Sequence, residues 1–310
     1  MFEFCRIPIE IAKNILANIS FFRHFKERVS RERLKSLQDI YRPIRLFEDL
    51  ISRSHGRLDL ADKVVLEVGP GNSMGMGLLF LAHGAKRVYL VDRFKHIFWD
   101  DYDAIYYRNF LSEISNQDVP NGSIVKEALR IKNGKIILNP DLLEYRLGDA
   151  ARIPLEDSSV DFLFSNAVLE HVRHVELAVQ EFARVTKEAG LNVHEVDLRD
   201  HFFSKKPLRL LSYSDWLWDF MTCNRPGYSN RLRFSDYCKM FESNKFVIER
   251  LLYTRTIEQT QVTSLKLSSK FKKYPWEELS ILAFWVFLKR KCRLSGSRAK
   301  TVLGLKDLGI

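Results

Sequence analysis

The chain has few cysteines and no long apolar run. Its four cysteines lie far apart in 310 residues and form no Cys-x-x-Cys pair, so reduced thiols and a cytoplasmic location are predicted. The longest apolar run, residues 281–288, falls well short of the roughly 20 residues that a membrane-spanning helix needs. Glu10 and Lys13 interrupt any apolar core of a signal peptide. The sequence therefore predicts a soluble protein that makes, at most, peripheral contact with a membrane.

Positive charge is in excess. Lys and Arg number 49 against 39 Asp and Glu, which gives a net charge of +10 at pH 7. The basic residues crowd into residues 23–35 and 289–293. This crowding is typical of a solvated basic surface or of attraction to an anionic partner, and both interpretations stay open.

The order of apolar segments predicts an α/β fold. Short, nearly continuous apolar runs predict buried strands at residues 64–68, 87–91, 143–147, 160–165 and 191–198. Helices at 74–83 and 175–187 alternate with these strands, as in a parallel sheet built by right-handed crossovers. Two late strands, at 246–255 and 281–289, have no strong helical pattern between them and could pair as an antiparallel edge.

Segments outside this alternation divide the chain. Three units are predicted: an N-terminal helical extension at 1–60, an α/β domain at 61–294 and a basic, flexible tail at 295–310. Apolar residues at helical spacing, interrupted at Pro43, predict two or three helices in the extension. The domain carries two insertions, at about 98–140 and 201–245, and the first contains an Asn133-Gly134 hairpin signal.

The first strand runs into a glycine turn, VVLEVGPGNSMGMG, at residues 64–77. Strand, glycines and helix in this order present free backbone N–H groups to a ligand, and Gly69 and Gly71 permit its close approach. A dinucleotide fingerprint would need glycine where Met74 stands, and a phosphate loop would need a lysine that is missing here. Glu67 would repel a pyrophosphate but suits a ligand that carries positive charge, such as S-adenosylmethionine (SAM). A tight turn without a ligand is the alternative.

Glu67-x-Gly69-x-Gly71 resembles the first motif of class I SAM-dependent methyltransferases, with Ser73 where that family usually has a third glycine. A second signal follows about 20 residues later, where Asp92 ends the second strand. An acidic residue at this place accepts hydrogen bonds from ribose hydroxyls in other nucleoside-binding sheets. The alternative is that Asp92 caps a helix that begins directly after it.

The stretch LGDAARIPLEDSSVDFLFSNAVLEHV, residues 147–172, resembles the adenine side of the same family. The resemblance implies that Asp149 accepts a proton from the adenine amino group, that Ala150 lies beside the ring and that Asn166 lines the SAM pocket. It also assigns His171, in the Leu-Glu-His-Val ending, to the cofactor side. The resemblance therefore implies SAM as cofactor and a Rossmann-like, mostly parallel seven-stranded sheet with helices on both faces and an antiparallel last strand.

Clues to the methyl acceptor follow the fifth strand. The stretches HEVDLRDHFFSKKPLRLLSYSDW and GYSNRLRFSDY resemble, more loosely, a branch of the type 11 methyltransferases found with bacterial surface-polysaccharide genes. This resemblance implies an acceptor hydroxyl on a sugar or glycan intermediate. Tyr213, Trp216 and Trp218 could pack against a sugar ring or form a core. Arg231 and Arg233 could bind acidic groups of the acceptor or lie on a solvated surface.

A sugar hydroxyl must lose its proton on transfer, so a base near the methyl group is expected. His201 is the candidate base, with Asp200 beside it and Asp197 before it as the groups that orient the ring. His171 is the competitor, because helix packing or capping explains it equally well. Asp197, Asp200 and His201 could also ligate Mg²⁺ or Mn²⁺, but they have no defined metal-ligand spacing, and no metal is predicted.

Other classes of function remain open. A small-molecule or lipid methyltransferase shares every cofactor residue with the preferred function. A nucleic-acid methyltransferase would explain the charge, but no Asn/Asp-Pro-Pro-Tyr/Phe motif follows the fourth strand, where residues 165–168 read Ser-Asn-Ala-Val. A non-catalytic SAM-binding protein is the structural alternative. The sequence also leaves open the oligomeric state, and whether the N-terminal helices cover the cofactor or lie against an anionic membrane.

Overall fold

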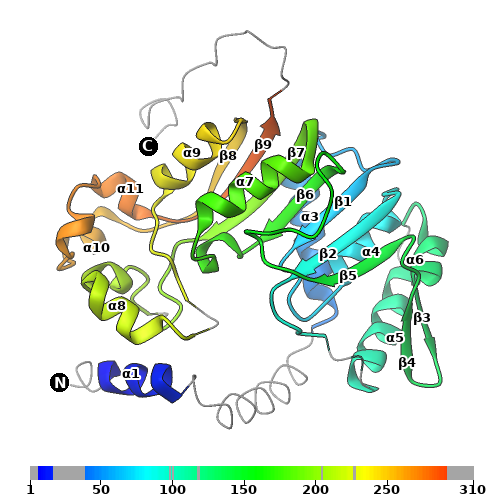
Figure 1. Ribbon diagram of the computed structural model, residues 1–310, viewed down its shortest axis with the longest axis horizontal. Coiled ribbons are helices and arrows are strands. Elements are labelled where there is room, and N and C mark those ends of the chain that lie inside the picture. The colour runs from blue at the N-terminus through cyan, green and yellow to red at the C-terminus, as the bar shows by residue number, and fades with distance from the viewer. Residues whose placement is uncertain are drawn as a thin grey trace.

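A seven-stranded sheet forms the centre of the molecule (Figure 1). The computed structural model describes residues 6–16, 39–97, 99, 101–116, 119–203, 205–225 and 228–291. In spatial order the strands are β5 (Leu143–Leu147), β2 (Arg87–Asp92), β1 (Val64–Val68), β6 (Val160–Asn166), β7 (Thr186–Asp197), β9 (Ile281–Arg290) and β8 (Phe246–Thr256). All neighbours pair in parallel except β9, which is antiparallel to both β7 and β8. The predicted mostly parallel sheet with an antiparallel last strand is confirmed.

Two apolar layers cover the sheet because successive side chains of a strand point to opposite faces. In β1, Val65 packs into one layer and Leu66 into the other. Four helices contribute to the first layer: α3 (Tyr41–Ser54), α4 (Gly75–Ala82), α5 (Asp101–Asn116) and α6 (Gly122–Ala128). The second layer is formed with α7 (Val175–Val185) and α9 (Phe234–Ser243). Helices on both faces of a mostly parallel sheet make the fold Rossmann-like, as predicted.

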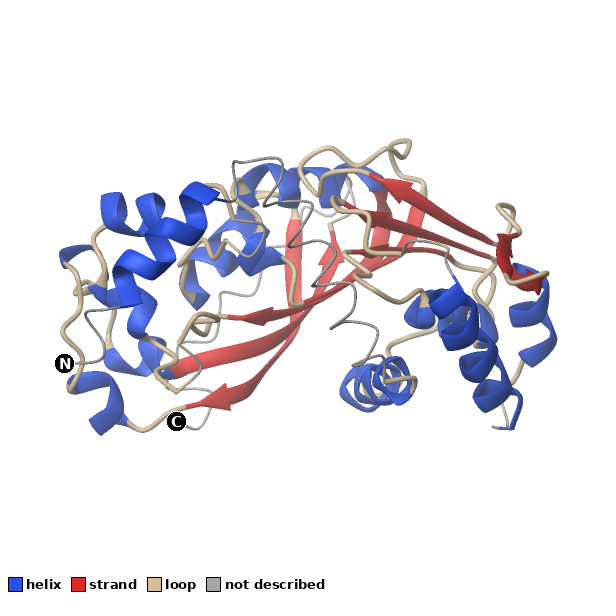
Figure 2. Ribbon diagram, turned by 90° about the horizontal axis from the view of Figure 1, so that it is seen from below, coloured by secondary structure: helices blue, strands red, loops and turns tan. Residues whose placement is uncertain are grey.

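A third apolar cluster lies beyond the end of the sheet. It joins α8 (Asp215–Thr222) to the segment between β8 and β9, and α1 (Arg6–Leu16) packs on α8. The side-chain amide of Asn14 donates to the Phe220 carbonyl at 2.8 Å, which fixes α1 there. Figure 2 shows this group of helices at the end marked N.

The last two strands, β8 and β9, pair in antiparallel as predicted, but the segment between them is helical although its sequence showed no strong helical pattern. This segment contains α10 (Gln259–Thr263), a 3₁₀ turn η3 (Ser269–Phe271) and α11 (Trp276–Ser280). Each of the two α-helices has only five residues, and one and a half turns are too short to show a helical apolar period.

The insertion after β2 folds as α5, α6 and a hairpin of β3 (Leu129–Lys132) and β4 (Lys135–Leu138). Asn133 and Gly134 join the strands with φ angles of 51° and 71°. A two-residue turn of the type that matches strand twist requires positive φ at both positions, and Asn-Gly tolerates it best. The predicted hairpin is therefore confirmed.

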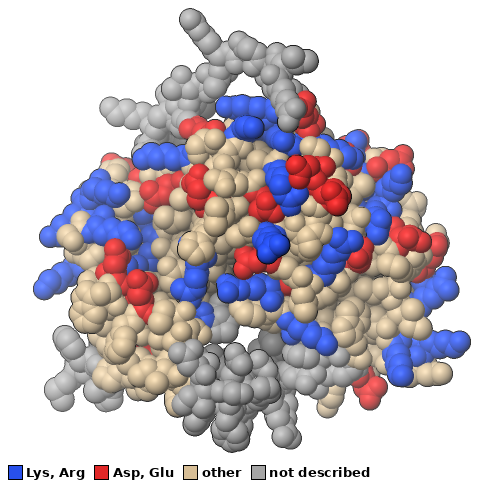
Figure 3. Space-filling view, in the orientation of Figure 1, with Lys and Arg blue, Asp and Glu red and all other residues tan. Residues whose placement is uncertain are grey.

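The structure describes only a small part of the two basic segments. Residues 17–38, which include the N-terminal basic run, and residues 292–310, which include the predicted tail, lie outside the described residues. Over the middle of the face in Figure 3, basic and acidic side chains are interspersed, and a basic group lies at the edge beside α10 and α11. Among the helices that the structure describes, none is both long enough and apolar enough to cross a bilayer.

Candidate functional site

The glycine turn connects β1 to α4 at the carboxyl edge of the sheet. Gly69 and Gly71 both have positive φ, 72° and 65°, a conformation that side chains with a Cβ rarely adopt. A Cβ on Gly69 would also lie 2.4 Å from Cγ2 of Val168, in the segment after β6. Ser73 closes the turn, because its Oγ accepts the N–H of Gly75 and contacts the Tyr106 hydroxyl at 2.8 Å. Glycine is therefore favoured here, and the turn lines a pocket. The prediction of free backbone N–H groups is wrong for Gly69 and Gly71, because these two groups donate to the Val91 carbonyl and to Oδ2 of Asp92.

Glu67 lies under this turn, near the end of β1, and its side chain is only 5% exposed. Its Oε2 atom has no hydrogen-bond partner among the described residues. Burial raises the pKa of Glu67 to about 8, and the neighbouring Asp92 carboxylate adds to the rise. A buried carboxyl group without a counter-charge favours a cationic ligand, because such a ligand would restore the ionised form.

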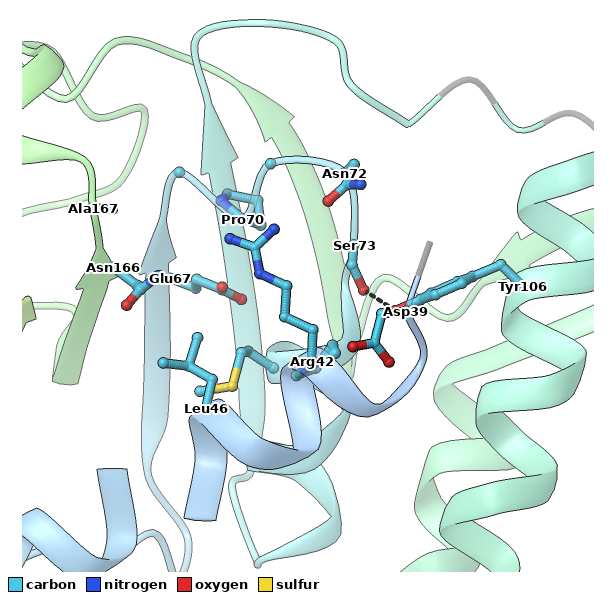
Figure 4. Close-up of a pocket in the computed structure, with 14 residues that line it drawn as sticks. Asp39, Arg42, Leu46, Glu67, Pro70, Asn72, Ser73, Tyr106, Asn166 and Ala167 are labelled. Atoms are coloured by element: carbon cyan, nitrogen blue, oxygen red, sulfur yellow. Dashed lines mark hydrogen bonds between the residues drawn. The ribbon is translucent and has the colours of Figure 1, made fainter. Parts of the chain in front are cut away.

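A pocket of about 240 Å³ lies over Glu67 and the turn (Figure 4). Asn166 lines it from the end of β6, and the Oδ1 atom of Asn166 is a second buried acceptor for which the described chain supplies no partner. In Figure 4 the Arg42 side chain extends from α3 to the turn, and the Glu67 carboxylate points toward it. The pocket thus offers acceptors for a cation and a guanidinium for an anion, which suits an amino-acid head group.

Arg42 and Tyr106 are lining residues that the sequence did not indicate. Arg42 comes from the N-terminal extension and Tyr106 from the first insertion, so both reach the pocket only through tertiary packing. Neither belongs to a motif, and no local pattern could have singled them out. The insertion and the extension are therefore parts of the site.

Asp92 ends β2 next to the glycine turn and is 6% exposed. Its Oδ2 accepts the Gly71 N–H at 3.0 Å and its Oδ1 accepts the Phe94 N–H at 2.8 Å. Burial raises the pKa of Asp92, and the backbone N–H of Phe94 opposes that rise. The helix-cap alternative is wrong, because α5 begins only at Asp101. Each carboxylate oxygen retains a lone pair with which a ribose hydroxyl could pair.

Asp149 and Ala150 follow β5, the strand next to β2. Asp149 accepts the N–H of Ala151 at 2.9 Å, and its other oxygen lies 3.5 Å from Nε of Arg93. Ala150 is 7% exposed and packs in the second apolar layer. The pocket is smaller than the roughly 300–1,000 Å³ of a typical ligand site, and neither residue lines it. A whole nucleoside would therefore extend beyond the pocket, past Asp92 toward Asp149.

A second polar group lies at the same edge of the sheet, where β6 and β7 end. The 3₁₀ turn η1 (Leu169–His171) follows β6, and His201 follows β7. The rings of His171 and His201 are 4.9 Å apart, centroid to centroid. Glu170 joins them, because one ligating atom of each of these three residues lies within 4.8 Å of the others. His171, assigned to the cofactor side from the sequence, is therefore a neighbour of the proposed base.

Asp197 is the carboxylate that lies beside His201, with Oδ2 3.6 Å from Nε2 of the ring. Burial acts to raise the pKa of Asp197, but hydrogen bonds from Arg199 and His201 outweigh it and hold that pKa well below its usual range. Asp197 is therefore an ionised partner for the ring. Asp200, the other predicted orienting group, instead accepts the N–H groups of Phe202 and Phe203 through Oδ1 at 2.7 and 3.0 Å.

Asp200 is 2% exposed, and burial raises its pKa to about 6. Its Oδ1 atom thus serves the loop backbone after β7, and its own N–H donates to the Pro207 carbonyl at 2.7 Å. The structure thus gives Asp197 the place beside the ring and gives Asp200 a place inside the loop.

The arginines and aromatics of the second insertion are mostly structural. Arg231 donates to the carbonyls of Leu210 and Tyr213, and Arg233, fully buried, donates to those of Leu198 and Ile281. Neither arginine lies on a solvated surface, so the alternative that the sequence left open, two solvent-exposed arginines, is wrong. Tyr213 and Trp218 are buried in the third cluster, whereas Trp216 is 71% exposed.

Part of the chain matches known methyltransferases. A family model described as a methyltransferase domain matches residues 102–193, less than a third of the chain, from α5 into β7. Malonyl-[acyl-carrier protein] O-methyltransferase of Yersinia pestis is 44% identical over 48 residues, which are 16% of this chain and 18% of that protein. The chain therefore matches less than a fifth of the length of this curated relative.

Among solved structures, the chain is similar at low identity to two proteins described as putative methyltransferases. A putative sarcosine dimethylglycine methyltransferase from Galdieria sulphuraria is 14% identical, with a TM-score of 0.47 over 80% of this chain and 86% of that one. A putative methyltransferase from Bacillus halodurans is 15% identical, with a TM-score of 0.44 over 82% and 99% of the two chains. Residues 102–193 thus match a methyltransferase domain, and the strand order of the sheet is that of a mostly parallel, Rossmann-like fold.

Proposed function

We propose that the protein is a SAM-dependent methyltransferase that transfers a methyl group to an acceptor hydroxyl on a sugar or glycan intermediate. The observation that carries the proposal is the buried Glu67 carboxyl, whose Oε2 atom has no hydrogen-bond partner among the described residues, in a pocket that the glycine turn lines. The His171–His201 pair lies at the same edge of the sheet, where an acceptor would meet the cofactor.

The residues of the pocket and of the strand ends beside it suit each part of the cofactor. Glu67 and the Asn166 carbonyl oxygen would hold the ammonium group, and the Arg42 guanidinium would hold the carboxylate. Asp92 would accept hydrogen bonds from the ribose, and Asp149 would accept one from the adenine amino group. When bound, SAM supplies a methyl group on a positively charged sulfur, which leaves as neutral S-adenosylhomocysteine.

On the acceptor side, His201 would remove the hydroxyl proton. Its side chain is 30% exposed, and Oδ2 of the ionised Asp197 lies 3.6 Å from Nε2 of the ring and would orient it. The acceptor O–H bond breaks, an O–CH₃ bond forms and the C–S bond of the donor breaks with its electron pair on sulfur. One proton is released for each methyl transferred.

A carboxylate acceptor is the second candidate. The Yersinia pestis relative is named as an O-methyltransferase of a malonyl-carrier protein, and its 48 matched residues favour transfer to oxygen in general. A carboxylate is already ionised at neutral pH, so its methylation needs no base. The sugar hydroxyl draws its support from the looser resemblance of the segments after β7 to the surface-polysaccharide branch of the type 11 methyltransferases.

The identity of the acceptor is tested by incubating the protein with methyl-labelled SAM and fractionated host extract. The proposal expects label in a glycan or nucleotide-sugar fraction, as an alkali-stable ether. Label in an alkali-labile ester on a carrier protein or small acid would support the second candidate and overturn the sugar assignment. Label in RNA or DNA would overturn both.

The role of His201 is tested by His201→Ala at saturating SAM, with the exposed His174→Ala as the matched control. The proposal expects unchanged SAM affinity and turnover lowered roughly 100-fold or more, because positioned bases contribute about that much. A variant with near wild-type turnover would exclude His201 from proton removal and would point to His171 or to a carboxylate acceptor.

A further inference from the structure

The cluster of Glu170, His171 and His201 has the composition of a metal site. Two imidazoles and one carboxylate are a donor set that binds Zn²⁺ and other divalent transition metals in proteins. In a tetrahedral zinc site, ligand atoms about 2.0–2.1 Å from the ion lie roughly 3.3 Å from one another. The three ligating atoms here lie within 4.8 Å of each other, so small side-chain rotations would bring them to that spacing.

Glu170 gives independent support, because its side chain is 3% exposed and belongs to the buried interior. Neither of its carboxylate oxygens makes a well-formed hydrogen bond in the part of the chain that the structure describes. Burial raises the pKa of Glu170 well above its usual range, and the nearby backbone N–H groups of Glu170 and Asp197 offset this rise only in part. Leaving both oxygens of a buried carboxyl unpaired is costly, and native proteins normally satisfy such groups with a donor or an ion. A cation between Glu170 and the two rings would satisfy it.

The histidines already have the outer partners that metal-ligating histidines use. The Nδ1 atom of His171 lies 2.7 Å from the Tyr228 carbonyl oxygen. A carbonyl can only accept, so Nδ1 carries the proton and the lone pair of His171 is at Nε2. His201 has the Asp197 carboxylate 3.6 Å from its Nε2, and Arg199 holds that carboxylate in place. Carboxylate and backbone carbonyl are the groups that orient such rings and raise their basicity.

We propose that Glu170, His171 and His201 bind a divalent transition-metal ion at the carboxyl edge of the sheet, with a fourth position open on the exposed side of His201. The burial of the three residues agrees with this geometry, since Glu170 is buried, His171 is intermediate and His201 is exposed. A closed structural site would need a fourth protein ligand, and three ligands with an open position are typical of catalytic zinc.

This inference rests on the proposed function only in the role it assigns to the metal. A hydroxyl that occupies the open position loses its proton more readily, because the ion stabilises the oxygen anion. His201 would then act as a ligand, and proton removal would depend on the metal rather than on the free ring. The proton would pass to solvent, and the overall balance of the methyl transfer stays the same.

Metal binding is tested without SAM or acceptor, on the full-length chain stripped with a chelator and desalted. Calorimetric titration with Zn²⁺ is expected to show about one equivalent bound per chain. His201→Ala should lower the Zn²⁺ affinity by more than the roughly 10- to 100-fold that loss of an outer partner costs. Because His201 is exposed, this variant should fold normally, and Glu170→Gln, which keeps the buried volume, is the second variant.

His174→Ala is the matched control, because His174 is exposed, lies three residues from His171 and is outside the cluster. It should bind Zn²⁺ like the wild type. Absence of Zn²⁺ binding by the wild type, or equal affinity in His201→Ala and the wild type, would overturn the proposal. Full methyl transfer by the chelator-treated protein would remove the metal from the reaction while leaving the methyltransferase proposal intact. Zn²⁺ binding without any methyl transfer would support the metal site and overturn the methyltransferase proposal.

Discussion

Glu67 should release a proton when SAM binds. In the free protein, burial raises its pKa to about 8, so at pH 7 about 0.9 of the molecules carry a protonated Glu67. A cationic ligand held by this carboxyl favours the ionised form and lowers the pKa. Binding at pH 7 should therefore release up to about 0.9 proton per SAM from this residue.

The sign of the pH dependence follows from the same linkage. Below pH 8 the proton competes with the ligand for the Glu67 carboxylate. The contribution of Glu67 to SAM affinity should therefore rise up to about tenfold per pH unit as the pH rises from 6 to 8, and should level off above pH 8. The amino group of SAM also titrates near neutral pH, and loss of its charge acts in the opposite direction. Glu67→Gln removes only the first contribution, so the difference between wild type and variant isolates it.

The assay is calorimetry in buffers of different ionisation enthalpy, which yields the number of protons released on binding. The wild type should release more protons than Glu67→Gln at pH 7, and the two should converge at pH 9. Equal proton release by both at pH 7 would refute the reasoning, because it would mean that Glu67 does not face the positive charge of the ligand.

Three further predictions concern the pocket and the core. Asp92→Ala should weaken SAM binding by about 1–3 kcal/mol, because hydrogen bonds to the ribose are lost. Asp92→Asn keeps one acceptor and should weaken binding less. If calorimetry gave the same loss of SAM affinity for both variants, Asp92 would not contact the ribose. Arg42→Ala should weaken SAM binding by about 1.5–3 kcal/mol, whereas Arg57→Ala, at an exposed position, should leave it unchanged. Equal SAM affinities of Arg42→Ala and the wild type would show that the Arg42 guanidinium does not contact the ligand. Burial lowers the pKa of His194 to about 3, so native stability should be lost as the pH falls from about 6.5 toward 3, by about 1.4 kcal/mol per pH unit. His194→Phe, which keeps an aromatic ring between those of Phe182 and Phe241, should flatten this acid dependence in denaturant titrations. An unchanged slope would show that His194 is not the source of the acid dependence.

The buried strands could be predicted almost residue by residue. β1 and β5 match their predicted ranges, and β2 and β6 differ by one residue, because short continuous apolar runs bounded by turns leave little choice. β7 begins at Thr186, five residues earlier than predicted. Its first residues are polar or small, and the pairing with β6 is irregular there, so the apolar pattern began later than the strand.

The site divides in a similar way. The glycine turn and its carboxylate could be predicted because they are local. One short stretch contains both the glycines that positive φ favours, Gly69 and Gly71, and the acidic residue at the strand end, Glu67. The roles proposed for Arg42 and Glu170 could not be predicted, because the residues that each one neighbours lie far away in the sequence. A buried carboxyl without a partner is visible only once the neighbours are placed.

The central claim is that the glycine turn holds SAM rather than a dinucleotide. The most direct measurement is calorimetric titration of the full-length protein with SAM, with S-adenosylhomocysteine and, separately, with NAD. The account predicts micromolar binding of SAM and S-adenosylhomocysteine, on the order of 7–8 kcal/mol, and no heat of binding with NAD. Binding of NAD without binding of SAM would contradict it.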